Sequence, residues 1–507
     1  MSIVRYCFIL IFCTTFFSCA SSYKTYKADK KFGRQPLQQD FTLLRNILAQ
    51  NHPALYWYTP KEKMDFYFDS LYNTIADSMT EQQYGWQIIA PLTQKIHCGH
   101  TTFSMSNNWN RFMKDKLIPS FPLFVKTWGD TVIVTGNLSV KDTVLKKGTI
   151  ITSINNIPVK KLQQQMFEYL PSDGYADNIN YIRLSRNFPY FHRSIFGIFK
   201  NYRVGYVDST GTEKKVLLPM YIQPIDTSKV SKKIASTGEK ISRRLFKKER
   251  RESYRSMMID TAINTAVLTL NTFSGGGGKH LRRFIKHGFR QLKKDSIGNL
   301  IIDLRNNGGG DIDLYALLTR YIRNTPFKVA DSAYAVSKSL RPFSKYIKQN
   351  FFTNLGLFFL TLKKTDGNYH FRFYERHTYH PKTNNNFNGK VYVLIGGPTF
   401  SASTLFCNAV KGQQNITIAG EESGGGWHGN SGIMIPDITL PNTKLKVRLP
   451  LFKIVQYNHV PKDGRGVVPD VYIPPTVESV VKGLDRKMIL VKEMIKISTP
   501  ELLKKIL

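Results

Sequence analysis

The stretch that decides the fold is Val391–Val410, with the sequence VYVLIGGPTFSASTLFCNAV. It begins with β-branched and aromatic residues, which predict a buried strand, and Gly396-Gly397-Pro398 ends that strand. The run LFCNAV then predicts a helix, so Ser401 lies at a strand-to-helix turn. A serine there has two uses: its hydroxyl caps the helix, or it attacks a carbonyl beside the free amides of the helix N-terminus. The rest of the chain has to decide between them.

The composition sets the scale and the charge of the protein. At 507 residues the chain is long enough for about two or three domains, and 42% hydrophobic residues are sufficient for their cores. The 72 lysines and arginines against 36 acidic residues leave a formal charge of +36, which attracts anionic partners. The chain has no zinc-finger, aromatic RNA-binding or basic-zipper signature, so we interpret the charge as solvated surface and expect no nucleic-acid partner.

The N-terminus indicates the compartment. After Arg5, residues 6–17 (YCFILIFCTTFF) form an apolar run that is too short to span a bilayer and suits the core of a signal peptide. Ser18, Cys19 and the small residues that follow resemble a bacterial lipoprotein cleavage site. That resemblance implies that Cys19 becomes the lipidated first residue, and that the protein is anchored in the cell envelope, in the periplasm or at the outer membrane. Simple secretion and an uncleaved anchor are the alternatives.

Changes of composition and periodicity divide the chain into segments. In order they are a signal peptide (1–19), a tether (20–38), a helical domain (39–110), a β-rich domain (117–222), a basic linker (223–259), an α/β core (260–480) with an insertion (326–388), and a C-terminal helix (481–507). In the helical domain, capping-box patterns that begin at Thr59 and Thr80 predict two helix starts. In the core, strand-like and helical runs alternate, which predicts a sheet with helical crossovers.

The β-rich domain contains a second informative stretch, Leu145–Val159. Two strand-like segments flank a turn and a helical run follows, an order that resembles the centre of a PDZ domain. Asn156 stands where that family usually has glycine, and asparagine tolerates the same left-handed backbone. The resemblance implies binding of an extended peptide as an added strand, and a β-rich spacer without a groove is the alternative.

Four motifs of the core occur in one order along the chain. They are Asn299–Gly310, Thr399–Ser403, Gly420–Gly425 and Gly464–Asp470. Together they resemble the C-terminal processing, or tail-specific, serine peptidases, and in particular their tricorn-like branch. The resemblance implies a mixed-sheet α/β core of the ClpP/crotonase-like kind, joined to an N-terminal helical domain and a PDZ-like β-rich domain.

The family pattern also implies a nucleophile. It is Ser401, the serine before Ala-Ser, with Ser403 as the alternative. The pattern further implies an oxyanion hole formed by the backbone amide of Ala402 and by one amide of the Gly308–Gly310 turn, which we assign to Gly309. Glycine suits this role because it lets the backbone approach a substrate carbonyl closely. The four motifs therefore favour the nucleophile over the helix cap at Ser401.

The general base expected here differs from the lysine of the bacterial processing branch. In that branch a lysine follows the serine, whereas here GEESGGGWHG (420–429) has glycines at the corresponding place. A histidine is the natural substitute because its pKa suits proton transfer near neutral pH. Gly99-His100-Thr101 matches the pattern of tricorn-like relatives, so His100 is the expected base, with His97 and His428 as alternatives.

The third group expected in such a triad is an acid that orients the histidine. In the tricorn-like branch an acidic residue precedes the Gly-Val-x-Pro-Asp motif, and Asp463 holds that position here. Glu421 and Glu422 are the alternatives. Asp303 and Arg305, at a strand end before the glycine turn, are expected to brace that turn rather than react.

No cofactor follows from the sequence. A metal site is suggested by His97, Cys98 and His100. Zinc needs three or four ligands, and no second Cys/His pair has suitable spacing, so we expect no bound metal. Cys98 and Cys407 are the two cysteines in the body of the mature chain, so no disulfide framework is expected.

The leading hypothesis is an envelope-anchored serine endopeptidase that cuts exported polypeptides. The alternative is a catalytically silent protein that binds peptides or apolar ligands on the same fold.

Overall fold

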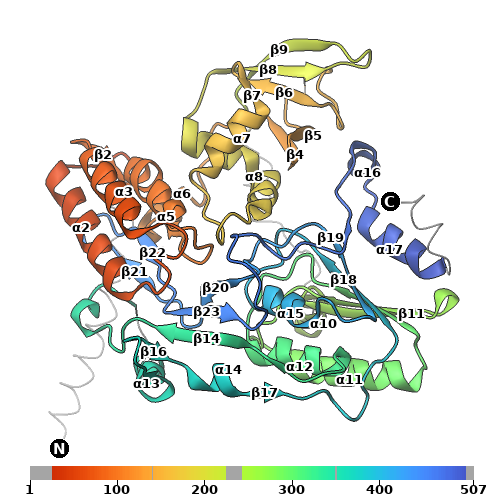
Figure 1. The fold of residues 1–507 in the computed structure, drawn as a ribbon. Coiled ribbons are helices and arrows are strands. Elements are labelled where there is room, and N and C mark those ends of the chain that lie inside the picture. The colour runs from red at the N-terminus through yellow and green to blue at the C-terminus, as the bar shows by residue number, and fades with distance from the viewer. Residues whose placement is uncertain (1–25, 140, 224–241, 349–350, 498–507) are drawn as a thin grey trace, which may run out of the picture.

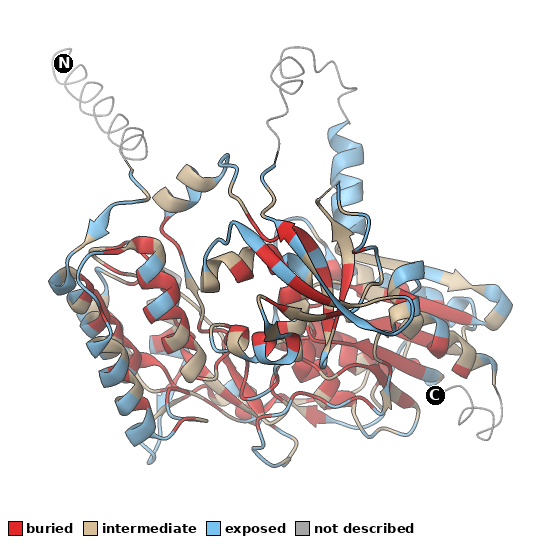
Figure 2. Cartoon of the chain, turned by 90° about the horizontal axis from the view of Figure 1, so that it is seen from above, coloured by how far each residue is buried: buried red, intermediate tan, exposed pale blue. Residues whose placement is uncertain are grey.

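The computed structural model describes residues 26–139, 141–223, 242–348 and 351–497. The predicted signal peptide with Cys19 and the first residues of the predicted tether lie outside these ranges. Figure 1 shows three parts: N-terminal helices on one side, a β-rich part above, and a larger α/β part below. Buried residues run through each part, whereas the outer faces of the N-terminal helices are exposed (Figure 2). The mixed α/β fold class predicted from the sequence is confirmed.

A six-stranded sheet forms the centre of the core, in the order β10-β11-β12-β18-β19-β24. Its strands are β10 (Arg255–Asp260), β11 (Thr265–Leu270), β12 (Asn299–Asp303), β18 (Lys390–Ile395), β19 (Ile416–Gly420) and β24 (Val471–Tyr472). Neighbouring strands are parallel, except that β10 is antiparallel to β11. Parallel strands are buried on both faces, which is why Leu300–Ile302 and Val391–Ile395 are apolar without interruption.

Each face of this sheet has its own apolar core, because successive side chains of a strand point to opposite faces. The helices that follow the strands are α11 (Leu281–Lys294), α12 (Ile312–Ile322), α15 (Ala402–Val410), α16 (Val477–Lys482) and α17 (Arg486–Lys496). Ile302 and Val393 pack with α11, α12 and α15. Ile301 and Leu394 pack on the other face with α17. The loops that follow β12 and β18 therefore meet at one edge of the sheet, where ligands of open α/β sheets bind.

The segment 326–388, predicted as an insertion of weak periodicity, supplies three strands of a second sheet and a separate β13-β17 pair. The second sheet has the order β15-β16-β14-β23-β20. The elements are β13 (Phe327–Lys328), β14 (Ala330–Ala335), α13 (Phe351–Leu360), β15 (Leu362–Lys363), β16 (Tyr369–His370), α14 (Arg372–Arg376), β17 (Thr378–Tyr379), β20 (Gly429–Gly432) and β23 (Phe452–Gln456). Four of these strands have only two residues, too few to show alternation in the sequence.

The N-terminal helices begin earlier than predicted. The elements are β1 (Lys31–Phe32), α2 (Arg34–Asn51), α3 (Lys61–Asn73), β2 (Met79–Thr80), α4 (Glu81–Tyr84), η1 (Gly85–Ile89), α5 (Ala90–Lys95) and α6 (Asn107–Met113). The tether ends before residue 31 because β1 pairs with β2. Thr80 forms the predicted capping box with Gln83. The capping box predicted at Thr59 is wrong: its hydroxyl donates to the Lys95 carbonyl, 2.6 Å away, and α3 begins without a side-chain cap.

The helical domain is attached to the core by a shared sheet and a buried carboxylate. The shared strands are β3 (Phe103–Ser104), β21 (Asp437–Thr439) and β22 (Lys446–Arg448). β22 lies between the other two and pairs with both. Asp40 is fully buried and accepts hydrogen bonds from the backbone amides of Asn442 and Thr443, both at 2.9 Å. These contacts hold the loop before β3, which contains His100, against the core.

The β-rich part has a core of its own. Its elements are β4 (Leu123–Trp128), β5 (Thr131–Asn137), β6 (Ile151–Ile154), β7 (Ile157–Pro158), α7 (Val159–Phe167), α8 (Asn178–Phe196), β8 (Asn201–Val207) and β9 (Glu213–Pro219). Asn155 and Asn156, in the turn between β6 and β7, have φ values of 50° and 65°, so asparagine adopts the left-handed backbone that the sequence predicts. The sequence did not indicate α8, which is kinked at Asn187, two residues before Pro189.

The described end of the predicted basic linker is an exposed helix. Residues 224–241 of the predicted basic linker lie outside the described ranges, and α10 (Arg243–Glu252) follows as a helix with no buried residue. Cys98 and Cys407 are both buried and free. Among the helices of the described ranges, none combines the length and the apolar character needed to cross a bilayer.

Candidate active site

Ser401 occupies the turn between β18 and α15, but it does not cap the helix. Its backbone has φ 56° and ψ −124°, and its side chain makes no capping hydrogen bond. A non-glycine residue in such a conformation costs about 1–3 kcal/mol and persists only where its surroundings impose it. A sharp, strained turn from a strand into a helix is the arrangement that exposes the nucleophilic serine of many hydrolases. The geometry therefore agrees with a nucleophile and disagrees with a helix cap.

Gly309 lies directly against this turn. A Cβ placed on Gly309 would come within 2.7 Å of Ser401 Cβ and within 2.9 Å of the Ala402 nitrogen. The amide of Ala402, the first residue of α15, donates no hydrogen bond within the described ranges. Such amides at a helix N-terminus lack an intrahelical acceptor and can bind an oxyanion. The structure thus brings Ala402 and Gly309 together beside Ser401.

The assignment of the Gly309 amide to the oxyanion hole needs a correction. This amide donates to Asn307 Oδ1 at 2.9 Å, so it is already used inside the turn. The amides of Gly308 and Gly310 donate no hydrogen bond within the described part of the chain. A second free donor in this turn therefore belongs to one of these two neighbours, while Gly309 supplies the close approach between the turns.

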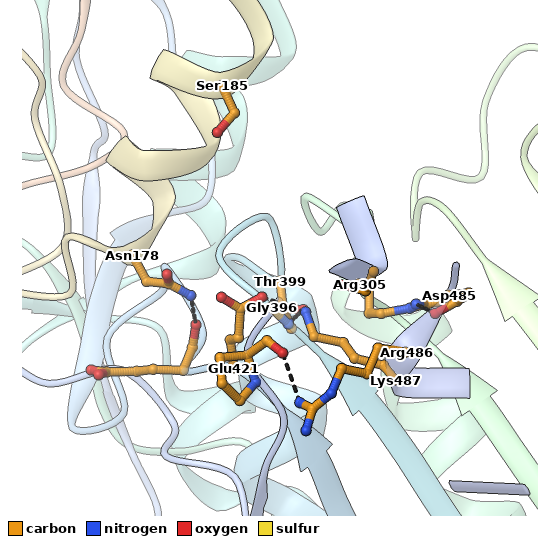
Figure 3. A network of polar contacts seen from close by, with 12 residues as sticks. Asn178, Ser185, Arg305, Gly396, Thr399, Glu421, Asp485, Arg486 and Lys487 are labelled. Atoms are coloured by element: carbon orange, nitrogen blue, oxygen red, sulfur yellow. Dashed lines mark hydrogen bonds and ion pairs between the residues drawn. The ribbon is translucent and has the colours of Figure 1, made fainter. Parts of the chain in front are cut away.

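Hydrogen bonds inside the core hold the loop that carries Ser401 (Figure 3). Thr399 is fully buried; its Oγ1 donates to the Leu304 carbonyl at 2.9 Å and accepts from the Gly396 amide at 3.1 Å. The first bond ties the serine loop to the end of β12, from which the glycine turn starts. The two loops that build the site are thus fixed to one another before any substrate arrives.

Ion pairs brace the same edge of the sheet. Arg305 donates to both oxygens of Asp303, at 2.9 and 2.6 Å, and to both oxygens of Asp485, at 2.5 and 2.8 Å. Asp303 and Arg305 thus have a structural role, as predicted, but they join the edge of the sheet to Asp485, whereas the sequence predicted a brace on the glycine turn. Glu421, an alternative for the triad acid, pairs with Lys487. Glu422, the other alternative, pairs with Arg465 at 2.6 Å, so neither glutamate is directed at a histidine.

Ser401 lines a cavity of about 1020 Å³ between the core, the helical domain and α8. Of the three candidate histidines, His100 lines this cavity and His97 and His428 do not. The rivals each use Nδ1 in a hydrogen bond with a backbone carbonyl, at 3.0 and 2.9 Å. Among the described residues no lysine lines the cavity, which agrees with the glycines found where a catalytic lysine would stand.

His100 is 7% exposed, and its ring lies against Phe400, with 4.7 Å between the ring centroids. Its Nδ1 is buried without a hydrogen-bond partner, and no hydrogen bond joins the ring to Ser401 within the described residues. Burial lowers the pKa of His100 to about 3, and the positive charge of Arg448 acts in the same direction. The ring is therefore neutral at physiological pH and lines the same cavity as Ser401.

The structure does not bring Asp463 into this site. Asp463 is exposed, does not line the cavity, and accepts a hydrogen bond from the Arg465 amide of its own loop at 2.8 Å. Its loop turns outward beside Tyr175, whose amide donates to the Gly464 carbonyl at 2.8 Å. The expectation that Asp463 orients His100 is therefore corrected.

A carboxyl that the sequence did not indicate lies beside His100 instead. Asp173 is 2% exposed, and one of its oxygens lies within 4.8 Å of a ring nitrogen of His100. It accepts hydrogen bonds from the Gly99 amide at 2.8 Å and from the Gly426 amide at 3.4 Å. Burial raises the pKa of Asp173 to about 7, against the stabilising effect of the two amides. In the sequence, Ser172-Asp173-Gly174 resembles an ordinary turn, so only the fold reveals this acid.

The fold and the site together define a serine-peptidase type of core: a strained serine, a free helix-terminal amide and a histidine around one cavity. The sequence model described as Peptidase family S41 matches residues 264–473. This segment contains the glycine turn, Ser401 and the GRGVVPD motif. Residues 264–473 are therefore an S41 peptidase domain, as the order of the four motifs predicts.

Solved structures resemble the whole chain and not only this domain. Mature CPAF is 14% identical, with 93% of this chain and 98% of that chain covered and a TM-score of 0.59. A serine-to-alanine mutant of CPAF gives a TM-score of 0.60 at the same identity and coverage. At this identity the likeness shows the fold, and it extends over the helical and β-rich parts. No curated protein sequence matches the chain.

Proposed function

We propose that this protein is a serine endopeptidase in which Ser401 is the nucleophile and His100 the general base. The observation that carries the proposal is the backbone of Ser401, with φ 56° and ψ −124°, which holds an uncapped hydroxyl next to the unused amide of Ala402. His100 lies on the wall of the same cavity. A nucleophile, an oxyanion donor and a neutral imidazole around one cavity are the groups that acyl transfer requires.

In the proposed reaction, Ser401 Oγ bonds to the carbonyl carbon of the peptide while its proton passes to His100. The carbonyl oxygen becomes an oxyanion and accepts hydrogen bonds from Ala402 and from a free amide of the glycine turn. The C–N bond then breaks, and His100 returns the proton to the leaving amine. Water repeats the sequence on the acyl-enzyme, which releases the acid and restores Ser401.

Asp173 is the acid that we assign to this mechanism. A pKa of about 3 keeps His100 neutral, as a base must be, but makes the imidazolium formed during attack costly. An anion beside the ring offsets that cost, and the carboxyl of Asp173 is within 4.8 Å. We expect Asp173→Asn to lower kcat by at least about 10²-fold with little change in KM, and to shift the pH profile.

The decisive experiment compares variants on an unfolded protein substrate. We expect Ser401→Ala and His100→Ala each to lose at least about 10³-fold in kcat/KM, because removal of a triad member abolishes most of the catalysis. His428→Ala is the matched control, since His428 lies off the cavity, and it should retain activity. A fluorophosphonate should label the wild type and not Ser401→Ala. Unchanged proteolysis in both site variants would refute the mechanism.

One observation favours the alternative of a silent binding protein. Within the described residues no hydrogen bond joins the Ser401 hydroxyl to His100, and His100 Nδ1 has no hydrogen-bond partner. Catalytic hydrogen bonds often tighten only when substrate binds, so this gap does not argue against an enzyme. Retention of an unfolded polypeptide without cleavage, together with no fluorophosphonate labelling, would support the binding protein instead.

We propose further that the chain is anchored to the cell envelope by a lipid on Cys19 and acts on exported polypeptides. The support is the apolar run of residues 6–17 followed by Ser18-Cys19-Ala20. Metabolic labelling with a radioactive fatty acid should mark the wild type, and Cys19→Ala should lose the label. A labelled Cys19→Ala variant, or an unlabelled wild type, would contradict this assignment.

A further inference from the structure

Three metal-ligating side chains meet behind the wall of the catalytic cavity. One ligand atom each from Cys98, His100 and Asp173 lies within 4.8 Å of the other two. All three residues are buried, with 3%, 7% and 2% exposure. In a tetrahedral zinc site, bonds of about 2.0–2.3 Å place ligand atoms roughly 3.3–3.8 Å apart. Small side-chain rotations therefore suffice to close the cluster around one ion.

A second observation shows that this cluster has unused coordination capacity. His100 Nδ1 is buried and has no hydrogen-bond partner among the residues that the structure describes. Buried polar atoms without partners are rare and usually mark a bound ion, a water or a functional group. Neither ring nitrogen of His100 forms a hydrogen bond with the described residues, although the rival His97 does so through Nδ1. His100 is thus free to act as a metal ligand.

We propose that Cys98, His100 and Asp173 form a binding site for a thiophilic divalent cation such as Zn²⁺. These residues are the Cys, His and carboxylate donors that zinc prefers, and three protein ligands leave a fourth position for water. Magnesium and calcium prefer oxygen ligands and do not suit a site with a thiolate. From the sequence we expected too few ligands for a metal, because Asp173 belongs to the β-rich domain and Cys98 and His100 belong to the helical domain.

The charges around the cluster suit this class of ion. Binding displaces the proton of the Cys98 thiol, and the ion then faces one thiolate and one carboxylate. The two charges of the ion then cancel those of the thiolate and the carboxylate, so the occupied site is neutral. This matters because two cations are near: Arg448 acts on His100, and Arg183 acts on Asp173. A divalent ion held by neutral ligands alone would leave a buried charge without compensation.

The consequence for the peptidase follows from the ligand set and rests on the proposed function. A metal on His100 occupies a ring nitrogen and holds Asp173 at the same time. The imidazole then cannot accept the proton of Ser401, so the ion inhibits proteolysis. Removal of the ion by a chelator restores the base. Binding itself is measurable without any activity, so the failure of one proposal is distinguishable from the failure of the other.

The binding test uses Co²⁺ as a spectroscopic substitute for Zn²⁺ on the full chain under reducing conditions. Coordination by Cys98 should give a thiolate-to-cobalt charge-transfer band in the near ultraviolet, and Zn²⁺ should abolish the band by displacement. Cys98→Ser should remove the band, and Asp173→Asn should weaken binding by at least about tenfold. Mg²⁺ should neither produce nor displace the signal.

Two matched controls make the result specific. Cys407→Ser removes the other buried free cysteine, and His97→Asn removes the neighbouring histidine; both should keep the band. Zn²⁺ should also raise the thermal midpoint of the wild type but not of Cys98→Ala, which gives a second readout if the serine variant is unstable. No band in the wild type, or a band of full strength in Cys98→Ser, would overturn the proposal.

Discussion

The contact between Gly309 and the nucleophile turn provides the sharpest prediction. Gly309 has φ 95°, and an added Cβ would lie 2.7 Å from the Phe400 carbonyl oxygen and from Ser401 Cβ. Ordinary contact begins at 3.4 Å, so Gly309→Ala must push the two loops apart by about 0.7 Å. The backbone strain at positive φ adds about 1–3 kcal/mol to the destabilisation.

The expected effect on catalysis is large because the displaced atoms are the reacting ones. A misplacement of about 1 Å costs on the order of 10²-fold, and the loss of one oxyanion donor costs about 10²–10³-fold. We therefore expect Gly309→Ala to lower kcat/KM by at least about 10²-fold, which corresponds to about 2.7 kcal/mol. The rate of fluorophosphonate labelling at Ser401 should fall in parallel, since it depends on the same turn.

The adjacent glycine is the matched control. Gly308 is exposed, and an added Cβ meets no atom within 4 Å. Gly308→Ala should keep a stability within about 0.5 kcal/mol of the wild type and lose less than about tenfold in activity. Circular dichroism and thermal unfolding of both variants separate a local effect from misfolding. If a folded Gly309→Ala protein matches Gly308→Ala in labelling and cleavage, the assignment of this turn is refuted.

Three further predictions concern the β-rich core, where His192 packs against Phe121 and Tyr202, the attachment of the helical domain, and the serine loop. Burial lowers the pKa of His192 to about 4, so below pH ~6.5 the unfolded chain binds a proton that the folded chain does not bind. The free energy of unfolding should therefore fall by up to about 3 kcal/mol between pH 6.5 and 4. His192→Phe should flatten this pH dependence in urea titrations. Asp40→Asn turns an amide group toward the backbone amides of residues 442 and 443. We expect the free energy of unfolding, measured with denaturant, to fall by about 2–4 kcal/mol and activity to be lost. An unchanged denaturation midpoint would contradict the role of Asp40 in docking the helical domain. Thr399→Val leaves the Gly396 amide unpaired and removes one of the two hydrogen bonds that the Leu304 carbonyl accepts, and it should cost about 1–3 kcal/mol and slow fluorophosphonate labelling. Equal labelling would show that the loop needs no such brace.

The sequence predicted the features that depend on short segments. The strand at 391–395, the turn at Ser401 and the glycine turn after β12 follow from apolar runs that end in glycine and proline. The capping box at Thr80 is also local and is present. At Thr59 the same pattern failed because a tertiary acceptor, the Lys95 carbonyl, takes the hydroxyl. Local chemistry thus predicts an element well where no distant group competes for it.

The acid of the site could not be predicted in this way. Asp463 stands in the position that the family pattern favours, yet its loop turns outward and binds its own backbone. Asp173 reaches Gly99 and Gly426, which are 74 and 253 residues away in the chain. No spacing rule connects such positions, because their contact depends on how separate domains dock. The strands of two residues in 326–388 were missed for a different reason, since they are too short to show a period.

Asp173 also explains why catalysis should respond to the position of the β-rich part. This one carboxyl joins three parts of the chain: Gly99 from the helical domain, Gly426 from the core, and its own loop between α7 and α8. His100 follows Gly99 directly, so a movement of the loop changes the surroundings of the base. A peptide that binds to the β-rich part and shifts this loop would therefore alter the charge next to His100 while leaving the turn at Ser401 in place. The nucleophile Ser401 belongs to the edge of the central sheet, whereas the proton-transfer groups His100 and Asp173 are brought together by contacts between domains. We therefore expect regulation of this protein at those contacts.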